Sequence, residues 1–511
     1  MARRTSETDP LQIAAVSAGA GVVGITLCPG KQGDSVFGAS WARDLEADIE
    51  AIRAWGAAAV VTLIEKDEFE LLGVEALPAT VSAAGIEWHH LPIKDVSVPD
   101  QRFELRWPLA WSRLRSRLAA GERVLVHCRG GLGRAGMIAS RLLVEFGEAP
   151  EAAIAKVRAA RPGAIETAAQ ETWVRTSVPG HGGADELALR RLACLVGGAI
   201  GDALGYRVEF DRWPEIRREY GAAGIRLAVA EGALEVSDDT QMTLFTLEGM
   251  TRAAEVGAIT GEIRAAYLDW LDTQRRGAGG RELRGQLATQ AALRHSRAPG
   301  TTCLAALRAG GAGTIELSIN HSKGCGGVMR TAPLGFLSDA VDDATVFRLG
   351  AEAAAVTHGH PEGYLPAGAM ALLTRDALNG VAWDASIAKL LALLQSWPAS
   401  AATVAAVEAA VDAAAAGVPS RERLSALGEG WVGEEALAVG LYCALTAQSF
   451  AECIELAANH DGDSDSTASI AGQLWGARYG LAGLPSDAVY RLDVVEPLLE
   501  VWGEYVRTEK W

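Results

Sequence analysis

The chain has 511 residues, which is too long for one ordinary domain and predicts about two or three. Its composition, 49% hydrophobic and 22% charged, is that of a globular protein. The formal net charge of −17 argues against a nonspecific binder of nucleic acid or of anionic membranes, because both functions need a basic surface.

The N-terminal segment shows no sign of a targeting sequence. Residues 1–11 are polar, so we expect a disordered tail and no secretory signal. Apolar stretches such as residues 192–200 are too short and too rich in glycine to span a bilayer. The seven cysteines are scattered along the chain, a pattern typical of a reduced cytoplasmic protein rather than of a disulfide framework.

From residue 12 to residue 176, apolar runs with strand character alternate with segments of helical spacing. We expect strands at residues 24–28, 57–64, 86–93 and 124–128, and helices at residues 41–55, 69–84, 104–120, 150–160 and 166–175. This alternation predicts an α/β domain with a mostly parallel sheet. In such domains ligands bind at the carboxyl ends of the strands, which is where Cys128 falls.

The segment from His127 to Arg134 carries the clearest chemistry of this domain. Its glycines, at the start of a predicted helix, let backbone N–H groups converge on an anion. A cysteine in that field is expected to be a thiolate, and Arg134 offers a planar fork for phosphate oxygens. The pattern favours a cysteine phosphatase, and the alternative is a turn around an inert buried cysteine. The predicted phosphate-binding residues are Arg129, Gly130, Gly131, Leu132 and Gly133.

A phosphatase also needs a general acid that protonates the leaving oxygen. Asp95 follows a strand that should neighbour the Cys128 strand, so we predict that it is this acid. Its alternative role is that of an ordinary loop carboxylate. Asp100 is the weaker candidate, because its place fits the N-cap of the next helix.

Residues 90–95, 127–136 and 161–167 resemble the kinase-associated branch of the dual-specificity phosphatases, and the resemblance spans residues from about 25 to about 175. It implies Cys128 as nucleophile, Arg134 as phosphate clamp and Asp95 as acid. The family usually has Ser or Thr directly after the arginine, and its hydroxyl stabilises the departing thiolate, but here Ala135 stands at that position. A phosphate-binding docking module with low turnover therefore stays open as an alternative.

Residues 177–185 are rich in proline and glycine and predict a linker. Beyond the linker, Ala- and Leu-rich segments with helical spacing dominate, and they predict an all-α domain over residues 186–511. We expect helices at residues 187–204, 240–255, 261–273, 283–298, 345–357, 367–379, 386–396, 403–416, 434–447, 450–459 and 467–479.

Two acidic clusters stand at expected helix starts in this domain. They consist of Ser237, Asp238 and Asp239, and of Asp463, Asp465 and Ser466. Each could be a simple N-cap, but a cap needs one carboxylate, and adjacent carboxylates repel unless a cation compensates them. Because no Cys and His cluster lies alongside, the oxygen donors favour Mg²⁺, Mn²⁺ or Ca²⁺ over Zn²⁺. So many carboxylates suggest two ions that share ligands.

These clusters, together with residues 201–209, residues 324–333 and His358, resemble the ADP-ribosylglycohydrolase family from about residue 187 to about residue 482. The resemblance implies two Mg²⁺ ions, or Mn²⁺, held by Ser237, Asp238, Asp239, Asp463, Asp465 and Ser466. It implies Glu209 and Asp239 as catalytic residues. It also implies that Gly324, Gly326, Gly327 and His358 bind ADP-ribose.

Other residues near these motifs receive no catalytic role. His358 could equally be a structural histidine, and we expect Asp202 to be structural. Cys325 stands where relatives often have Asn, so we assign it no chemistry. Trp475 and the remaining tryptophans are expected to pack against helices or on the surface.

Together these observations predict a cytoplasmic, bifunctional hydrolase. The first domain would hydrolyse phosphomonoesters on a phosphorylated substrate. The second would remove ADP-ribose, with metal ions, from a modified protein or from a small-molecule ADP-ribose adduct. We also consider the hypothesis that both activities act on one ligand class. No membrane partner is expected, nor nucleic acid as a nonspecific partner. A helical domain that only binds ADP-ribose is the third hypothesis.

Overall fold

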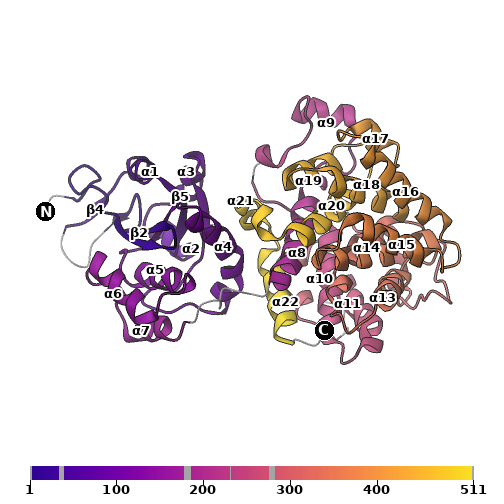
Figure 1. The fold of residues 1–511 in the computed structure, drawn as a ribbon, viewed down its shortest axis with the longest axis horizontal. Coiled ribbons are helices and arrows are strands. Elements are labelled where there is room, and N and C mark those ends of the chain that lie inside the picture. The colour runs from indigo at the N-terminus through magenta and orange to yellow at the C-terminus, as the bar shows by residue number, and fades with distance from the viewer. Residues whose placement is uncertain (1–2, 34–38, 178–185, 231, 275–281, 509–511) are drawn as a thin grey trace. The chain divides into compact units, whose positions relative to one another are not determined.

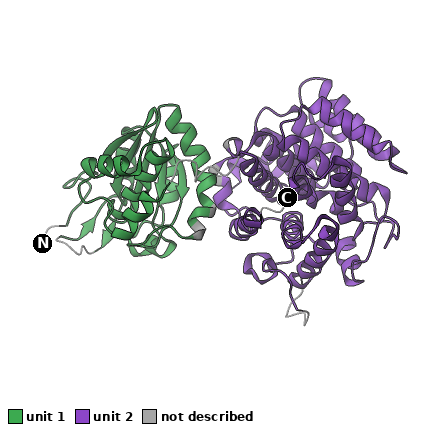
Figure 2. Cartoon of the chain, turned by 60° about the horizontal axis from the view of Figure 1, so that its bottom comes forward, with its two compact units in different colours: residues 1–185 green, residues 186–511 purple. Residues whose placement is uncertain are grey.

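The computed structural model describes residues 3–33, 39–177, 186–230, 232–274 and 282–508. The chain forms two compact units, residues 1–185 and residues 186–511 (Figure 1, Figure 2). The first is an α/β unit and the second is built of helices, which confirms the predicted fold class. Of the predicted linker only Ser177 belongs to the described part of the chain, and residues 178–185 lie outside it.

A five-stranded sheet with the order β1-β2-β7-β5-β6 forms the centre of the first unit. Only β1 and β2 pair antiparallel, and the other neighbours are parallel. The central strand is buried on both faces because helices cover both. Val124 and Val126 pack on one side and Leu125 on the other. The strands are β1 (Ala14–Ala18), β2 (Gly21–Leu27), β5 (Ala57–Thr62), β6 (Glu87–His90) and β7 (Arg123–Cys128).

Seven helices surround this sheet in the described part of the first unit, and β3 (Gln32–Gly33) pairs with β4 (Trp41–Ala42) beside it. The helix that we predicted over residues 69–84 is in fact two short helices. Gly73, with a φ of 62°, follows the end of the first of them. The helices are α1 (Leu45–Ala54), α2 (Lys66–Leu71), α3 (Leu77–Ala83), α4 (Gln101–Ala119), α5 (Gly133–Glu145), α6 (Pro150–Ala160) and α7 (Ala168–Arg175).

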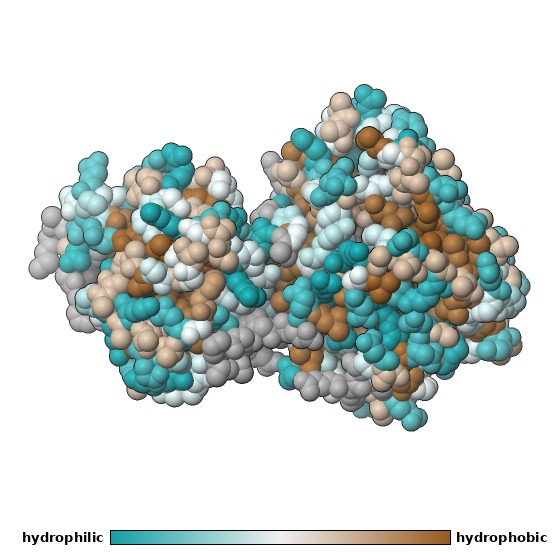
Figure 3. Space-filling view, in the orientation of Figure 1, coloured by the Kyte–Doolittle hydropathy of each residue, from teal (hydrophilic) through white to brown (hydrophobic). Residues whose placement is uncertain are grey.

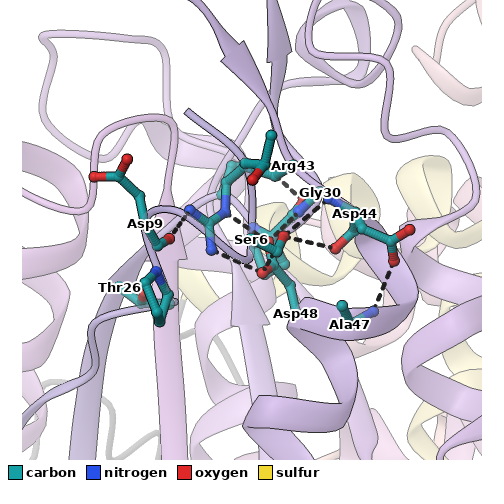
Figure 4. A network of polar contacts seen from close by, with 12 residues as sticks. Ser6, Asp9, Thr26, Gly30, Arg43, Asp44, Ala47 and Asp48 are labelled. Atoms are coloured by element: carbon teal, nitrogen blue, oxygen red, sulfur yellow. Dashed lines mark hydrogen bonds and ion pairs between the residues drawn. The ribbon is translucent and has the colours of Figure 1, made fainter. Parts of the chain in front are cut away.

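The prediction of a disordered tail over residues 1–11 is wrong for the part that the structure describes. The hydroxyl of Ser6 donates a hydrogen bond to Asp48 at 2.9 Å, and the carbonyl of Asp9 accepts one from Arg43 at 2.6 Å (Figure 4). Polar composition suggested disorder, but a buried Arg43–Asp48 ion pair supplies partners for these polar groups.

The helices of the second unit follow the predicted order and include several that we did not predict, such as α9, α12 and α22. They are α8 (Glu186–Gly205), α9 (Trp213–Tyr220), α10 (Asp238–Arg252), α11 (Ile259–Thr273), α12 (Thr301–Arg308), α13 (Asp343–Ala355), α14 (Pro361–Leu378), α15 (Trp383–Leu394), α16 (Ala401–Ala415), α17 (Arg421–Ser425), α18 (Gly433–Thr446), α19 (Phe450–Ala458), α20 (Ser464–Tyr479), α21 (Ser486–Arg491) and α22 (Val495–Thr508).

Helix α8 packs unusually closely against α20 at the centre of this unit. A Cβ atom on Gly201 would lie 2.1 Å from the carbonyl of Ala468, and one on Gly205 would lie 2.1 Å from the carbonyl of Ser464. Glycine therefore lets the two backbones meet. This packing brings the end of α8 next to the start of α20, where the second acidic cluster lies.

The helix that we predicted over residues 283–298 does not form. The segment contains only the short 3-10 turns η3 (Leu287–Thr289) and η4 (Ala291–Leu293). Carboxylates on neighbouring helices accept hydrogen bonds from backbone N–H groups of this segment. Asp269 accepts from Gly285 at 2.9 Å, and Glu248 accepts from Leu287 at 2.9 Å.

The surface carries polar and apolar residues side by side, as the face drawn in Figure 3 shows. Within the described ranges, no helix combines the length and the apolar composition needed to cross a membrane.

Candidate active sites

The first candidate site lies at the carboxyl end of β7, where the strand passes into α5. Cys128 ends the strand and is 3% exposed. The backbone N–H of Gly131 donates a hydrogen bond to its Sγ atom at 3.3 Å. Gly131 has a φ of 68°, and a Cβ atom there would lie 2.3 Å from the backbone of Thr26, so this turn requires glycine. The loop thus holds Cys128 at a helix N-terminus, the arrangement that an anion cradle needs.

Two side chains from a later segment fix this loop. Glu166 accepts a hydrogen bond from the N–H of Gly133 at 2.9 Å, and Arg161 donates one to the carbonyl of Gly131 at 3.2 Å. Gly130, by contrast, faces open space. Because the N–H of Gly133 already has a partner, it is the least available of the predicted phosphate-binding groups.

Arg134 is almost fully buried and ion-paired. Its two terminal nitrogens bond the carboxylate of Glu68 at 2.6 and 2.9 Å, and Nη1 also donates to the carbonyl of Ile93 at 2.9 Å. Burial acts to lower the pKa of Arg134, but Glu68 and the neighbouring Cys128 outweigh it and raise that pKa. Sequence reasoning missed Glu68, because nothing local indicates that α2 faces the loop.

Asp95 lies beside the loop, as predicted for a general acid. Its Oδ1 atom is 2.8 Å from Nη2 of Arg134, and its Oδ2 atom is 3.9 Å from Nη1 of Arg129. The side chain is 46% exposed, so it can reach a leaving group. A phosphate oxygen must compete with Asp95 for Arg134. Asp100 is the N-cap of α4 and accepts from the N–H of Phe103 at 3.1 Å, which confirms its structural role.

His127 and Ala135 flank the motif inside the core. The Nε2 atom of His127 lies 2.8 Å from the hydroxyl of Thr62, which also accepts a hydrogen bond from Trp88. Burial lowers the pKa of His127 to about 3, so the ring is neutral at physiological pH. Ala135 is fully buried. His127 therefore fixes β7 against β5 and supplies no charge to the loop.

The second candidate site is a cavity of about 480 Å³ in the helical unit. Most of the predicted metal-binding, catalytic and ADP-ribose-binding residues line it. They are Glu209, Asp238, Asp239, Asp463, Asp465, Ser466, Gly324, Gly326 and His358. Ser237 and Gly327 are not among the lining residues. The hydroxyl of Ser237 caps α10 by accepting from Asp239, and Gly327 packs against the carbonyl of Gly363.

The carboxylates of this cavity are buried and close to one another. Burial, reinforced by the charge of Asp465, raises the pKa of Asp238, Asp239 and Asp463 well above the usual range. The same causes raise the pKa of Glu209 to about 10. Among the residues that the structure describes, Oδ2 of Asp239 and Oε2 of Glu209 are buried without a hydrogen-bond partner.

This donor set fits a hard divalent cation. It consists of buried carboxylate and hydroxyl oxygens whose mutual repulsion a cation would relieve, and oxygen atoms are the ligands that Mg²⁺ and Mn²⁺ prefer. In the described part of the chain, no three His, Cys, Asp or Glu side chains form a ready-made metal-binding group. The fit therefore rests on the chemistry and burial of the oxygens.

Asp202 holds the first acidic cluster in place. It is fully buried at the end of α8 and accepts hydrogen bonds from the N–H groups of Ser237 and Thr240, both at 3.0 Å. It also accepts one from the hydroxyl of Thr240 at 2.5 Å. These contacts confirm the structural role that we expected for Asp202.

The glycine-rich loop contacts the second acidic cluster through a thiol. Sγ of Cys325 donates to Oδ2 of Asp463 at 2.8 Å, a contact that we did not predict. The backbone N–H of Cys325 donates to the carbonyl of Trp431 at 3.2 Å, so the loop is tied to the segment that precedes α18.

His358 lines the cavity beside this loop. Its Nδ1 atom lies 2.8 Å from the hydroxyl of Thr357, and burial lowers its pKa to about 3. A Cβ atom on Gly326 would lie 3.0 Å from the imidazole ring. His358 is thus a neutral ring that a ligand in the cavity would meet.

Two aromatic residues that sequence reasoning missed also line the cavity. Phe210 is 73% exposed and Trp431 is 40% exposed, and their rings lie nearly parallel with centroids 6.5 Å apart. Trp431 packs against Phe210 at the surface, which agrees with the expected packing role, but its place on the cavity was not predicted. The place of Phe210 directly after Glu209 was the only local signal. Trp475 is buried and packs against Tyr479, as expected.

Two family models match the chain. One, described as ADP-ribosylglycohydrolase, matches residues 184–509. The other, described as Swiss Army Knife protein, DSP-PTPase phosphatase domain, matches residues 37–174. The two matches correspond to the two units of the structure.

Individual relatives match one unit each. Cyclin-dependent kinase inhibitor 3 of Rattus norvegicus is 30% identical over 135 residues, which cover 26% of this chain and 62% of that protein. ADP-ribosylarginine hydrolase Tri1 of Pseudomonas putida (strain GB-1) is 27% identical over 306 residues, which cover 59% of this chain and 74% of that protein. The chain thus spans less than two thirds of the first of these relatives.

Among solved structures, an ADP-ribosylglycohydrolase-related protein complex matches 63% of this chain and 99% of its own chain. The sequence identity is 25% and the TM-score is 0.43.

Proposed function

The chain belongs to the ADP-ribosylglycohydrolase family and carries a dual-specificity-type phosphatase domain, and from this premise we propose that it is a bifunctional hydrolase. The helical unit would remove ADP-ribose from a modified substrate with two Mg²⁺ ions, or Mn²⁺. The α/β unit would hydrolyse a phosphomonoester through Cys128. The observation that carries the first activity is the set of buried carboxylates on one cavity.

The residues that would hold the ions are Asp238, Asp239, Asp463, Asp465 and Ser466, while Ser237 is a weaker candidate because it caps α10. When bound, the ions would neutralise these carboxylates and bind the ribose hydroxyls. Asp239 would orient the attacking water through its unpartnered oxygen. Glu209 would donate a proton to the leaving group, because its burial favours the protonated carboxyl.

We propose ADP-ribosylated arginine as the first acceptor to test, because a relative with 27% identity is named an ADP-ribosylarginine hydrolase. Modified serine and small-molecule adducts are the other acceptors for the same assay. A cytoplasmic location is part of the proposal, and the seven free cysteines support it.

The test is release of ADP-ribose by the full-length protein from a panel of these acceptors, with and without Mg²⁺. We expect release that depends on Mg²⁺ and is lost in Asp238→Asn but kept in Cys128→Ser. Binding of free ADP-ribose without release from any acceptor would replace this proposal with that of a reader.

For the phosphatase, Cys128 would attack the phosphorus atom while Arg134 binds the phosphate oxygens and Asp95 protonates the leaving oxygen. We expect turnover of an aryl phosphate that Cys128→Ser abolishes and Asp95→Asn slows. A docking module is the second candidate, and the absence of a hydroxyl at Ala135 favours it. Aryl phosphate bound by the wild type but never turned over would support docking.

We also propose that the two activities share a ligand class, such as a phosphorylated ADP-ribosyl adduct. The support is only that one chain joins two units that both match hydrolase families. Processing of every ADP-ribosylated and phospho-ADP-ribosyl substrate at the wild-type rate in Cys128→Ser would rule out this coupling.

A further inference from the structure

Four cationic side chains lie at the Cys128 loop, and they differ in how far nearby carboxylates neutralise their charge. They are Lys31, Arg129, Arg134 and Arg161. Arg134 is paired with the carboxylates of Glu68 and Asp95. Arg129 lies 3.9 Å from Asp95. Lys31 forms no ion pair with any residue that the structure describes. Its Nζ atom donates instead to the uncharged carbonyl of Arg129 at 3.2 Å. Arg161 also has no ion pair among the described residues and donates to the carbonyl of Gly131, so Lys31 and Arg161 are the two cations of the loop without a described carboxylate partner. Of the two, Lys31 is the one that bonds the residue directly after Cys128.

Lys31 is held where it stands by its own backbone and by an aromatic ring. Its N–H donates to the carbonyl of Cys28 at 3.4 Å, and its carbonyl accepts from the N–H of Arg43 at 3.2 Å. The preceding Gly30 donates to Asp48 at 2.8 Å, within the network that Figure 4 shows. The ammonium lies 5.4 Å from the centre of the Trp41 ring. These contacts hold the half-buried side chain of Lys31 against Arg129, the residue that directly follows Cys128.

The electrostatic environment of Lys31 includes the nucleophile itself. Burial and the charge of Arg129 lower the pKa of Lys31, whereas Cys28, Cys128 and Asp95 favour its charged form. The centre of the Trp41 ring that the ammonium faces also lies 5.1 Å from Cζ of Arg4 and 5.9 Å from Cζ of Arg43, so two more cations stand at this ring. Because a partly buried pair of charges is screened less than a surface pair, the ammonium can act on the sulfur of Cys128.

Besides Arg134 and the N-terminus of α5, the sulfur of Cys128 has few described partners. The N–H of Gly131 is its one hydrogen-bond donor among the described contacts. The side chain that follows Arg134 is the methyl group of Ala135, which cannot donate a hydrogen bond. When the thiolate leaves the phosphoenzyme, a hydrogen-bond donor or a nearby cation can stabilise the charge that returns to sulfur.

We propose that Lys31 is a positioning residue of the phosphatase site, whose ammonium stabilises the Cys128 thiolate as the phosphoenzyme breaks down. The inference rests on the proposed phosphatase activity. In the first step the S–P bond forms, the P–O bond breaks, and Asp95 gives its proton to the leaving oxygen. In the second step water attacks phosphorus and gives a proton to Asp95. The S–P bond then breaks and its electron pair returns to sulfur beside Lys31, which releases inorganic phosphate.

The experiment compares the full-length wild type with Lys31→Met, Lys31→Arg and Lys31→Met/Ala135→Ser, and uses Lys66→Met as a surface control. Rapid-quench measurements with p-nitrophenyl phosphate follow the burst of p-nitrophenol and the amount of trapped phosphoenzyme. We expect Lys31→Met to lower kcat about tenfold and to accumulate phosphoenzyme, because one partly screened charge pair is lost. Lys31→Arg should retain turnover, and the added hydroxyl of Ala135→Ser should restore it.

The outcomes separate this inference from the activity on which it rests. Wild-type kcat and no trapped phosphoenzyme in Lys31→Met would overturn the role of Lys31 and leave the phosphatase intact. A rise in KM alone would also overturn it, since Lys31 would then bind substrate. If the wild type shows no turnover that Cys128→Ser abolishes, the proposed phosphatase activity fails, and the role of Lys31 fails with it.

Discussion

The Cys128 loop and the acidic cavity differ in the sign of charge of the side chains that surround them. The loop collects Lys31, Arg129 and Arg134 around a cysteine, with glycine N–H groups at the start of a helix. The cavity is lined by five carboxylates, and the pKa values of four of them are raised above the usual range. The first site thus offers an anion its own N–H groups and cations, whereas we propose that the second site binds divalent cations.

The two sites also differ in how they are assembled. Cys128 and Arg134, the proposed nucleophile and phosphate clamp, are six positions apart in one strand–helix connection. The cavity takes its residues from helix starts more than two hundred positions apart, held together by the close packing of α8 against α20. A contiguous motif is easier to recognise, but an assembled site depends more on the whole fold. The following substitutions test that difference.

The largest effect is expected from removing the nucleophile. Cys128→Ser should lower phosphomonoester hydrolysis by roughly 10³-fold or more, because a serine hydroxyl is not ionised at this position. Release of ADP-ribose should stay at the wild-type rate, since the cavity lies wholly within the other unit. Steady-state assays of both reactions measure this separation. A matching loss of ADP-ribose release would show that the two sites do not work independently.

The next largest effect is expected in the acidic cavity. Asp238→Asn should lower Mg²⁺-dependent release of ADP-ribose by about 10²-fold, because a ligand of the proposed ions is lost. Mg²⁺ should raise the Tm of the wild type by binding the folded state, and this shift should shrink in the variant. Glu408→Gln, which removes an exposed carboxylate, serves as the control. An equal Mg²⁺ shift in all three proteins would contradict the metal site.

A smaller effect, on stability, is expected from breaking the buried ion pair between Arg134 and Glu68, and it should exceed the effect of breaking a surface ion pair. Glu68→Gln should destabilise the first unit by about 3 kcal/mol, because it leaves the guanidinium of Arg134 buried with half of its partner charge. Urea-induced unfolding of the full-length chain measures the change. Glu50→Gln removes an exposed partner of Arg53 and should leave the unfolding midpoint in place. Equal midpoints for both variants would show that Arg134 does not depend on Glu68.

The smallest effect concerns pH and the neutral histidine beneath the loop. Burial depresses the pKa of His127 to about 3, below its value of about 6.5 in an unfolded chain. Its contribution to stability is therefore fully present above pH of about 6.5 and is lost as the pH falls towards 3, because only the unfolded state then binds the proton.

His127→Gln should flatten this dependence, since glutamine can still bond Thr62 but takes up no proton. Urea midpoints at several pH values between 7 and about 4 measure the slope, whose limit is about 1.4 kcal/mol per pH unit for one group. An unchanged slope would mean that the other buried histidines, His90, His358 and His460, account for the acid sensitivity.

Sequence patterns were sufficient wherever neighbours along the chain decide the structure. The alternation of apolar runs and helical spacing predicted the parallel sheet and the place of Cys128 at a strand end. Asp95 does reach the loop, but the predicted neighbourhood of its strand with the Cys128 strand is wrong, because β5 lies between β6 and β7. Asp100 was correctly assigned as an N-cap, because capping depends on residues three positions away.

The predictions failed where side chains that are distant in the sequence determine the local structure. The helix over residues 283–298 is absent, and Asp269 and Glu248, on other helices, accept hydrogen bonds from N–H groups of this segment. The N-terminal segment is not a disordered tail because Arg43 and Asp48 give it partners. Trp431 looked like a packing residue, and only the folded chain places it on the cavity beside Phe210.

The amino-acid sequence by itself determined the two-unit organisation, the nucleophile loop and the two acidic helix starts, since each depends on spacing within a short segment. The tertiary structure alone decided what surrounds these groups. It paired Arg134 with Glu68, placed the ammonium of Lys31 on the carbonyl of Arg129, and buried oxygens of Asp239 and Glu209 that have no partner among the described residues. The physical reason is that burial and electrostatic interactions depend on distances in space, and segments far apart in sequence fix those distances.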